Sequence, residues 1–235
     1  MEGKELRLDF DGVYMNATVY VNGEKMGTHP YGYTPFSFDI TDKVKVGEEN
    51  VVAVKVDHKT PSSRWYSGSG IYRSVHLSVM DKVHVGLNGT KVETPDLKSD
   101  TKNVTTNIKT TVQNEGAEKA SVELTHNIFK KGTEESIGSV TTQAQEVEAG
   151  KSQVIEATTK AKSPSLWSPE NPALYTVRTE VKVGGKVVDT YDTEFGFRYF
   201  EMTTDKGAYL NGEKIKLKGV CMEYEERRIR RSCYS

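Results

Sequence analysis

Apolar and polar side chains alternate through residues 1–80, which is the period of β-strands that expose one face to solvent. The pattern is clearest where Leu6, Leu8 and Phe10 are separated by charged side chains. It returns at residues 18–21, 36–40, 52–56 and 75–79. These are about five strands where a jelly roll has about eight. Residues 1–80 are therefore predicted to form a partial jelly-roll sandwich that lacks its early strands and has an unpaired sheet edge.

A second alternating pattern begins near residue 81 and continues to residue 197. Its first strand is expected to end in a turn at Asn88-Gly89, because this dipeptide favours tight turns. Residues 104–112 then alternate without a break, and Gly184-Gly185 is expected to join the last two strands as a hairpin. Some seven short strands in about 115 residues are typical of an immunoglobulin-like β-sandwich. The sequence is therefore predicted to be all-β, with two successive sandwiches.

Residues 198–222 contain another hairpin signal, Asn211-Gly212. The apolar side chains that follow it, Ile215, Leu217 and Val220, predict a strand that enters a buried sheet. Residues 223–235 are a charged tail that is too short to supply such a sheet and is expected to be disordered. The segment 198–222 therefore looks like a lead-in hairpin to a domain that the sequence does not contain.

The charges are balanced, with 32 basic and 33 acidic residues, so neither a nucleic acid nor an anionic membrane is expected as a partner. No apolar run reaches the roughly 20 residues of a membrane span, and the N-terminus lacks the apolar core of a signal peptide. A cytoplasmic protein is therefore expected. The five histidines occur singly, and Cys221 and Cys233 form no disulfide framework. We expect no cofactor, no metal site and no catalytic triad.

Arg64, Trp65 and Tyr66 stand out in a long irregular loop between the strands at 52–56 and 75–79. The loop is rich in glycine, but a strand rather than a helix follows it, which argues against phosphate binding. In one interpretation the two aromatic rings and the guanidinium form a platform for a sugar. In the other, the rings plug one end of the sandwich and Arg64 pairs with an acid. Composition alone favours the plug.

Several short motifs resemble the sugar-binding domain of glycoside hydrolase family 2. They are Leu8–Val13 (LDFDGV), Val19–Gly23 (VYVNG), Gly32–Phe36 (GYTPF), Arg64–Tyr66 (RWY) and Gly70–Arg73 (GIYR). Leu166–Tyr175 (LWSPENPALY) is similar to the sequence that ends the family's immunoglobulin-like domain. The order and spacing of these motifs make the resemblance specific, although each alone is weak. The family includes β-galactosidases, β-glucuronidases and β-mannosidases.

The resemblance implies a galactose-binding-like jelly roll, an immunoglobulin-like domain and then a (β/α)₈ barrel with two catalytic glutamates that perform retaining hydrolysis. The barrel is absent here, so no catalytic residue is assigned, and Glu223 and Glu225 lie on the charged tail. In the family, the loop before the Gly-Ile-Tyr-Arg strand reaches the mouth of the active site, so Arg64, Trp65 and Tyr66 are the candidate substrate-binding residues. Some β-galactosidases have a metal-binding acid just before this Trp. Ser63 and Arg64 stand there instead, so no metal is assigned.

Three functions are therefore compared. The first is the non-catalytic N-terminal portion of a β-galactosidase-like enzyme, inactive alone and weakly bound to β-galactosides at best. The second is a stand-alone carbohydrate-binding or adhesion module, and the third is a structural immunoglobulin-like protein without a ligand. The lead-in at 198–222 favours the first. Its expected partners are carbohydrate and, through exposed sheet edges, a second copy or a separate barrel fragment.

Overall fold

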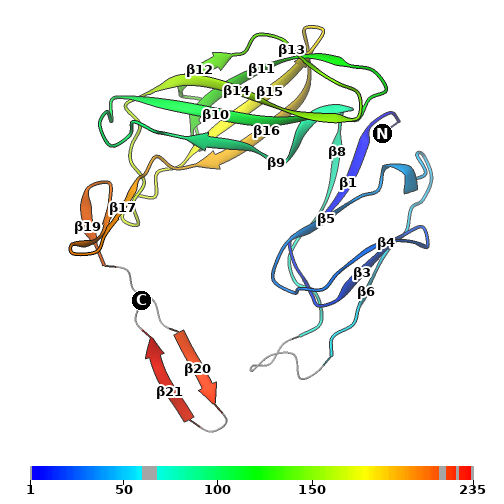
Figure 1. Cartoon of the computed structure of the whole chain (residues 1–235). Helices are drawn as coiled ribbons and strands as arrows, with labels where there is room; N and C mark the ends of the chain where they lie inside the picture. Colours follow the sequence, from blue (N-terminus) through cyan, green and yellow to red (C-terminus); the bar gives the residue numbers. More distant parts are fainter. Residues whose placement is uncertain (1, 60–67, 217–220, 226–227, 234–235) are drawn as a thin grey trace. The chain divides into compact units, whose positions relative to one another are not determined.

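The computed structural model describes residues 2–59, 68–216, 221–225 and 228–233. These residues form β-strands and one short 3-10 helix, η1 (Thr41–Lys43), so the predicted all-β class is confirmed (Figure 1). Within the described part of the chain, no helix is long and apolar enough to cross a membrane. The chain divides into two units, residues 1–82 and 83–235.

The first unit consists of three antiparallel sheets. Their strand orders are β5-β1-β8, β4-β3-β6 and β2-β7. The strands are β1 (Glu5–Phe10), β2 (Val13–Tyr14), β3 (Ala17–Val21), β4 (Glu24–His29), β5 (Phe36–Asp39), β6 (Val52–Val56), β7 (Gly70–Ile71) and β8 (Val75–Met80).

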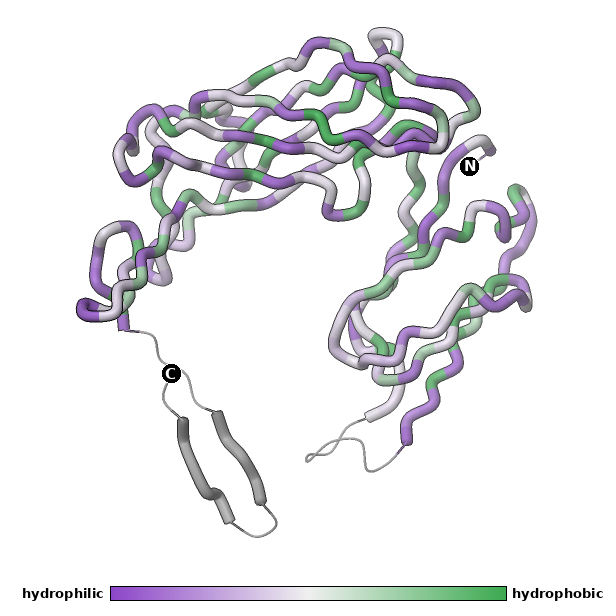
Figure 2. Tube along the Cα trace, in the orientation of Figure 1, coloured by the Kyte–Doolittle hydropathy of each residue, from purple (hydrophilic) through white to green (hydrophobic). Residues whose placement is uncertain are grey.

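The core of this unit is built from every second side chain of β1 and β3. Leu6, Leu8 and Phe10 of β1 pack in one cluster with Val19 and Val21 of β3. Figure 2 shows the corresponding alternation of hydrophilic and hydrophobic residues along the strands. The two three-stranded sheets therefore enclose a common core, as the alternating pattern predicts for a sandwich.

Asn22 and Gly23, a dipeptide that favours tight turns, form a turn in the first unit. Both residues have positive φ, +51° and +85°, and they join β3 to β4 as an antiparallel hairpin. Strand β4 itself is absent from the sequence-based prediction because Glu24–His29 (EKMGTH) has almost no apolar alternation. It forms because the turn places it beside β3, which supplies its hydrogen-bonding partner.

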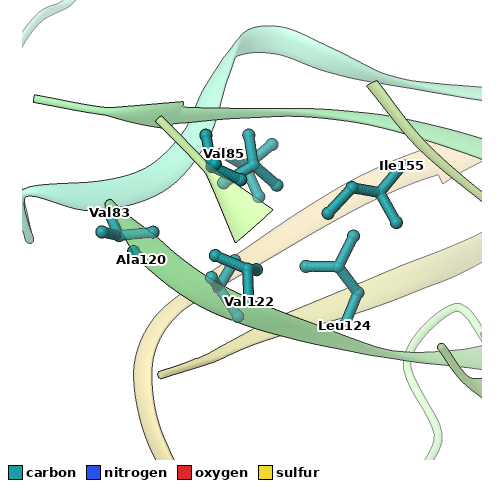
Figure 3. Close-up of a cluster of buried hydrophobic side chains, with 9 residues drawn as sticks. Val83, Val85, Ala120, Val122, Leu124 and Ile155 are labelled. Carbon is teal, nitrogen blue, oxygen red and sulfur yellow. The ribbon is translucent and has the colours of Figure 1, made fainter. Parts of the chain in front are cut away.

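The second unit contains a sandwich of two antiparallel sheets, with strand orders β14-β10-β9 and β12-β11-β15-β16, and with β13 paired to β11. Figure 3 shows the core between them, where side chains of the two sheets converge. This is the immunoglobulin-like sandwich that the strand count predicts. The strands are β9 (Val83–Glu93), β10 (Asn103–Asn114), β11 (Ala120–Lys130), β12 (Ser136–Thr141), β13 (Gln145–Val147), β14 (Lys151–Lys162), β15 (Tyr175–Val183) and β16 (Lys186–Phe195).

The predicted turn at Asn88-Gly89 is wrong, because β9 continues through it. The register with β10 shifts here, from Val112 opposite Val85 to Thr110 opposite Thr90. The extra residues form a bulge in which Asn88 has a φ of +54°. The Asn88 amide donates to the Tyr191 hydroxyl at 3.1 Å. At this position Asn-Gly forms a bulge within a strand and does not reverse the chain.

The lead-in segment forms a three-stranded antiparallel meander of β17 (Phe200–Thr203), β18 (Gly207–Leu210) and β19 (Glu213–Ile215). Its second turn is the predicted Asn211-Gly212, with φ of +52° and +83°. Leu217 and Val220 lie outside the described residues. Within the last part of the chain, β20 (Cys221–Glu225) and β21 (Arg228–Cys233) are paired antiparallel. Their register places Glu223 opposite Arg231 and Glu225 opposite Arg228.

Candidate functional site

The predicted sugar-binding residues Arg64, Trp65 and Tyr66 lie outside the described residues. Their loop leaves β6 after Val56 and returns to β7 at Gly70. The two described flanks are joined, because His58 Nδ1 lies 2.9 Å from the Ser69 hydroxyl. The loop therefore departs and returns at one place on the first unit, and the neighbouring side chains define that place.

Three exposed aromatic residues near these flanks, Tyr31, Tyr33 and Tyr72, are called here the tyrosine surface. Between 45 and 56% of each is exposed. Tyr31 and Tyr33 meet edge to face with ring centroids 5.6 Å apart, and Tyr33 contacts the buried Tyr14 in the same way at 5.3 Å. Tyr14 in turn contacts the His58 ring at 5.1 Å. A chain of ring contacts thus leads from Tyr31 to the flank of the predicted sugar loop.

Close approach of glycine backbone holds two of these rings in place. A Cβ at Gly32 would lie 2.2 Å from the Tyr14 ring, and one at Gly12 would lie 2.7 Å from the Tyr72 ring. The Tyr72 hydroxyl also donates to the Gly32 carbonyl oxygen at 2.8 Å. The Arg73 guanidinium carbon lies 5.3 Å from the centroid of the Tyr72 ring, within the range of a cation–π contact. Tyr72 is therefore fixed in orientation although nearly half of it is exposed, and the buried Tyr14 is held against Gly32.

Such a surface suits a neutral, hydroxyl-rich ligand. Tyrosine offers a flat apolar face to C–H groups and a hydroxyl that donates and accepts hydrogen bonds. Next to it, His29 stacks on Phe36 with centroids 4.5 Å apart, and its Nε2 lies 3.0 Å from the Thr34 hydroxyl. Sequence reasoning did not select Tyr31 and Tyr33. Their position in the sequence could have pointed to them, because two aromatic residues flank a glycine between strands, where polar residues are usual.

The carboxyl groups of the described residues show no sign of acid–base chemistry. Where the pKa of a carboxyl departs clearly from its ordinary value, it is lowered, whereas a general acid needs a raised pKa. Burial raises the pKa of Asp9, but hydrogen bonds from Arg7, Ser37 and Ser78 outweigh that effect and lower it. Within the described ranges, no group of three or more His, Cys, Asp or Glu side chains is placed to hold a metal ion. The other carboxyl groups with a lowered pKa are those of Glu93, Asp96 and Asp100.

Trp167 marks a second point of interest, where the sandwich of the second unit meets the β17–β19 meander. The Arg198 guanidinium carbon lies 4.5 Å from the centroid of the Trp167 ring. A Cβ added at Gly196 would lie 3.0 Å from the Trp167 Cβ. The Asn211 side-chain amide donates to the Trp167 carbonyl oxygen at 2.9 Å. Trp167 is thus engaged in contacts at the junction between the sandwich and the meander.

Comparison with known proteins assigns both units to one family. Residues 1–80 match the model of the family 2 glycosyl hydrolase sugar binding domain. Residues 90–198 match a second model of glycosyl hydrolases family 2. The chain belongs to glycosyl hydrolase family 2. The tyrosine surface and the predicted sugar loop of this family 2 chain both lie within residues 1–80, the part that matches the sugar binding domain model.

Two curated relatives and one solved structure show how much of a family 2 protein this chain represents. It is 42% identical to the β-galactosidase BoGH2A of Bacteroides ovatus over 95% of this chain and 26% of that protein. A putative β-glucuronidase of Formosa agariphila is 37% identical over 94% of this chain and 20% of that protein. A family 2 member from Bacteroides cellulosilyticus superposes with a TM-score of 0.87 and 33% identity, over 94% of this chain and 30% of that one. The chain therefore spans about a quarter of the length of the curated relatives it matches.

Proposed function

We propose that this chain is the non-catalytic, sugar-contacting portion of a family 2 β-glycosidase of the β-galactosidase type, without hydrolase activity of its own. The observation that carries the proposal is the succession of two family 2 domains along one chain. The same stretch occupies about a quarter of much longer proteins named as glycosidases. A stand-alone module would have no need of the meander at 200–215, which continues beyond the second sandwich.

The sugar is proposed to contact Arg64, Trp65 and Tyr66 together with the tyrosine surface. Support comes from the described flanks of the loop, since the linked rings of Tyr14 and Tyr33 reach His58. The exposed aromatic faces would stack on the C–H face of a pyranose. The Arg64 guanidinium would donate hydrogen bonds to the hydroxyl oxygens of the sugar. The affinity is weak in this proposal because the surface is open and covers one face of the ligand.

A β-galactoside is favoured over a β-glucuronide for two reasons. The curated relative cited above at 42% identity is named a β-galactosidase. The tyrosine surface is built from neutral rings, whereas the carboxylate of a glucuronide is best recognised by paired cationic donors. Of the candidate loop residues, Arg64 alone carries such a donor.

The test is calorimetric titration of the pure chain with methyl β-galactoside and, in parallel, with methyl β-glucuronide. Trp65→Ala and Tyr33→Ala should each weaken galactoside binding by about three- to tenfold, the value of one aromatic contact. Phe200→Ala is the matched control, because Phe200 is an equally exposed aromatic residue of the second unit. Unchanged binding by Trp65→Ala, together with a large drop in its melting temperature, would show that Trp65 is a plug in the sandwich rather than a ligand contact.

Absence of activity is tested with p-nitrophenyl β-galactoside. The expected rate of hydrolysis equals that in buffer alone. Retaining hydrolysis needs two carboxyl groups about 5 Å apart, and the proposal assigns no such pair to this chain. Turnover by the pure chain that is lost in Glu223→Gln or Glu225→Gln would overturn this part of the proposal and leave the sugar-binding part standing.

A further inference from the structure

A pocket lies on the outer face of the second sandwich, over the sheet that contains β11, β15 and β16. Its volume is about 350 Å³, within the range of about 300–1,000 Å³ that is typical of ligand sites. The register of the sheet places Phe129 opposite Thr176 and Arg178 opposite Asp192. Val177, between Thr176 and Arg178, is buried in the core, so these four side chains project from the opposite face of the sheet. They form the floor of the pocket.

The loop between β11 and β12 forms one wall of this pocket, through Thr133 and Glu134. Lys131 ties the loop to neighbouring segments of the chain. The Lys131 amide donates to the Leu174 carbonyl oxygen at 3.0 Å, and its ammonium group lies 2.8 Å from the carboxylate of Glu194 on β16. The wall is therefore held in place before a ligand arrives, which lowers the entropic cost of binding.

The guanidinium of Arg178 is the best-positioned polar group of the pocket. Its Nε and Nη2 donate to the two carboxylate oxygens of Asp192, both at 3.0 Å, and its central carbon lies 5.6 Å from the centroid of the Phe129 ring. Hydrogen bonds to Asp192 raise the pKa of Arg178, and the nearby charge of Glu134 adds to this effect. The two bonds to Asp192 use two of the five N–H donors of a guanidinium. Three donors are left for a ligand.

The charges that line the pocket cancel. Lys130 and Arg178 are cationic, and Glu134 and Asp192 are anionic. An anionic ligand would meet two carboxylates, and a cationic ligand would meet two cations. A neutral ligand with several hydroxyl groups could instead accept hydrogen bonds from the guanidinium and donate to the carboxylates. The Phe129 ring adds an apolar surface for C–H groups, so the lining fits a sugar.

We propose that this pocket is a second carbohydrate site, on the immunoglobulin-like domain, which takes one neutral sugar unit. Arg178 donates to hydroxyl oxygens of the sugar, Asp192 accepts from a hydroxyl group, and Phe129 contacts the C–H groups. The inference is independent of the sugar site proposed above, because that site lies in the first unit and shares no residue with this pocket. Either site can therefore fail its test without the other.

Amide chemical shifts of the isotope-labelled chain 1–235 test the proposal residue by residue. The probes are methyl β-galactoside, methyl β-glucoside and methyl β-mannoside, with sodium sulfate as an anionic probe and glycine as a zwitterionic one. At least one glycoside should cause saturable shifts in residues 129–135, 176–178 and 192, whereas sulfate and glycine should not. Shifts there with sulfate or glycine but with none of the three glycosides would overturn the proposal, as would the absence of any shift.

Two variants test the named contacts. Arg178→Lys keeps the positive charge but lacks the planar fork of donors, so it should weaken binding by about tenfold. Thr176→Tyr should abolish binding, because a larger residue suited to strands then fills the pocket. Unchanged amide shifts in β10 and β14 would show that both variants remain folded.

Glu156→Gln is the matched control. It removes an exposed cross-strand ion pair of the other sheet, in which Lys109 Nζ lies 3.0 Å from the Glu156 carboxylate, and it should bind like the wild type. Equal weakening by Glu156→Gln would overturn the proposal, because the loss would then not depend on the pocket. Binding of wild-type strength by both Arg178→Lys and Thr176→Tyr would overturn it as well.

Discussion

His126 lies on β11 with its imidazole fully buried, and its Nδ1 is 3.0 Å from the hydroxyl of Thr179 on the neighbouring strand β15. Its Nε2 has no hydrogen-bond partner among the described residues. Burial lowers the pKa of His126 from 6.5 to about 4, because the charged imidazolium would lose its hydration. The ring is therefore held neutral in the native state at pH values where the unfolded chain binds a proton.

The stability of the second unit should consequently fall as the pH falls. Above pH 6.5 neither state is protonated and the full stability is present, whereas between 6.5 and about 4 the unfolded state alone takes up a proton. The free energy of unfolding should drop by about 2 kcal/mol between pH 7 and pH 5. Urea unfolding followed by Trp167 fluorescence, in a Trp65→Phe background that removes the other tryptophan, measures this change.

A double variant separates His126 from the remaining titrating groups. His126→Leu with Thr179→Val replaces both hydrogen-bonding partners by apolar groups of similar size, which is tolerated better than removal of one partner. Its unfolding free energy should change less between pH 7 and pH 5 than that of the wild type, by about 2 kcal/mol. An equal pH dependence in the two proteins would show that the imidazole is not kept neutral by burial.

At the level of single elements, the bulge in β9 depends on Gly89. A Cβ there would lie 2.7 Å from the carbonyl oxygen of Gly86 and 3.0 Å from that of Thr111. Both contacts are with backbone, which cannot move away without breaking the β9–β10 ladder. Gly89→Ala should therefore destabilise the second unit by about 1–3 kcal/mol, measured by the same urea unfolding.

Gly86→Ala is the matched control for this prediction. Gly86 lies in the same bulge, but the nearest atoms to its added Cβ belong to the flexible Gln113 side chain, the closest at 3.4 Å. That distance is an ordinary van der Waals contact, so the stability should change by less than about 0.5 kcal/mol. Equal destabilisation by the two alanine variants would mean that a backbone clash at Gly89 is not the cause.

The three Asn-Gly dipeptides show how far sequence can predict such elements. At Asn22-Gly23 and Asn211-Gly212 both residues have positive φ and the chain reverses. At Asn88-Gly89 the asparagine alone has positive φ, and the strand continues. The dipeptide predicts a left-handed residue in all three cases. Whether the chain turns is decided by β10, which pairs with β9 on both sides of the bulge, and a local pattern does not contain that pairing.

In the candidate site, too, a local pattern predicts some features, and others depend on contacts between distant parts of the chain. Alternation predicts most strands and both sandwiches, because each strand has one buried face. The sequence also selects Arg64, Trp65 and Tyr66 as an unusual local group, and their role stays a prediction. It does not select the tyrosine surface, since Tyr31 and Tyr72 are far apart in sequence. They become neighbours through the Tyr72 hydrogen bond to Gly32, which requires the folded unit.

Within the second unit, Asn211 fixes the β17–β19 meander to the sandwich. Its side chain donates to the Trp167 carbonyl oxygen at 2.9 Å and accepts from the Tyr199 amide at 3.1 Å. The Trp167 amide in turn donates to the Phe197 carbonyl oxygen at 2.9 Å. One asparagine at a hairpin turn thus joins three segments of the second unit.

Asn211→Gly tests this role because glycine retains the positive φ of the turn and removes both side-chain hydrogen bonds. Loss of two bonds at about 0.5–1.5 kcal/mol each should raise amide hydrogen exchange in residues 199–215 by roughly tenfold or more. Exchange in β10 and β11, in the sandwich core, should stay as in the wild type and serves as the internal control. Faster exchange throughout the second unit would instead mean that Asn211 supports the sandwich itself, and unchanged exchange in 199–215 would mean that the meander is held by contacts other than the Asn211 side chain.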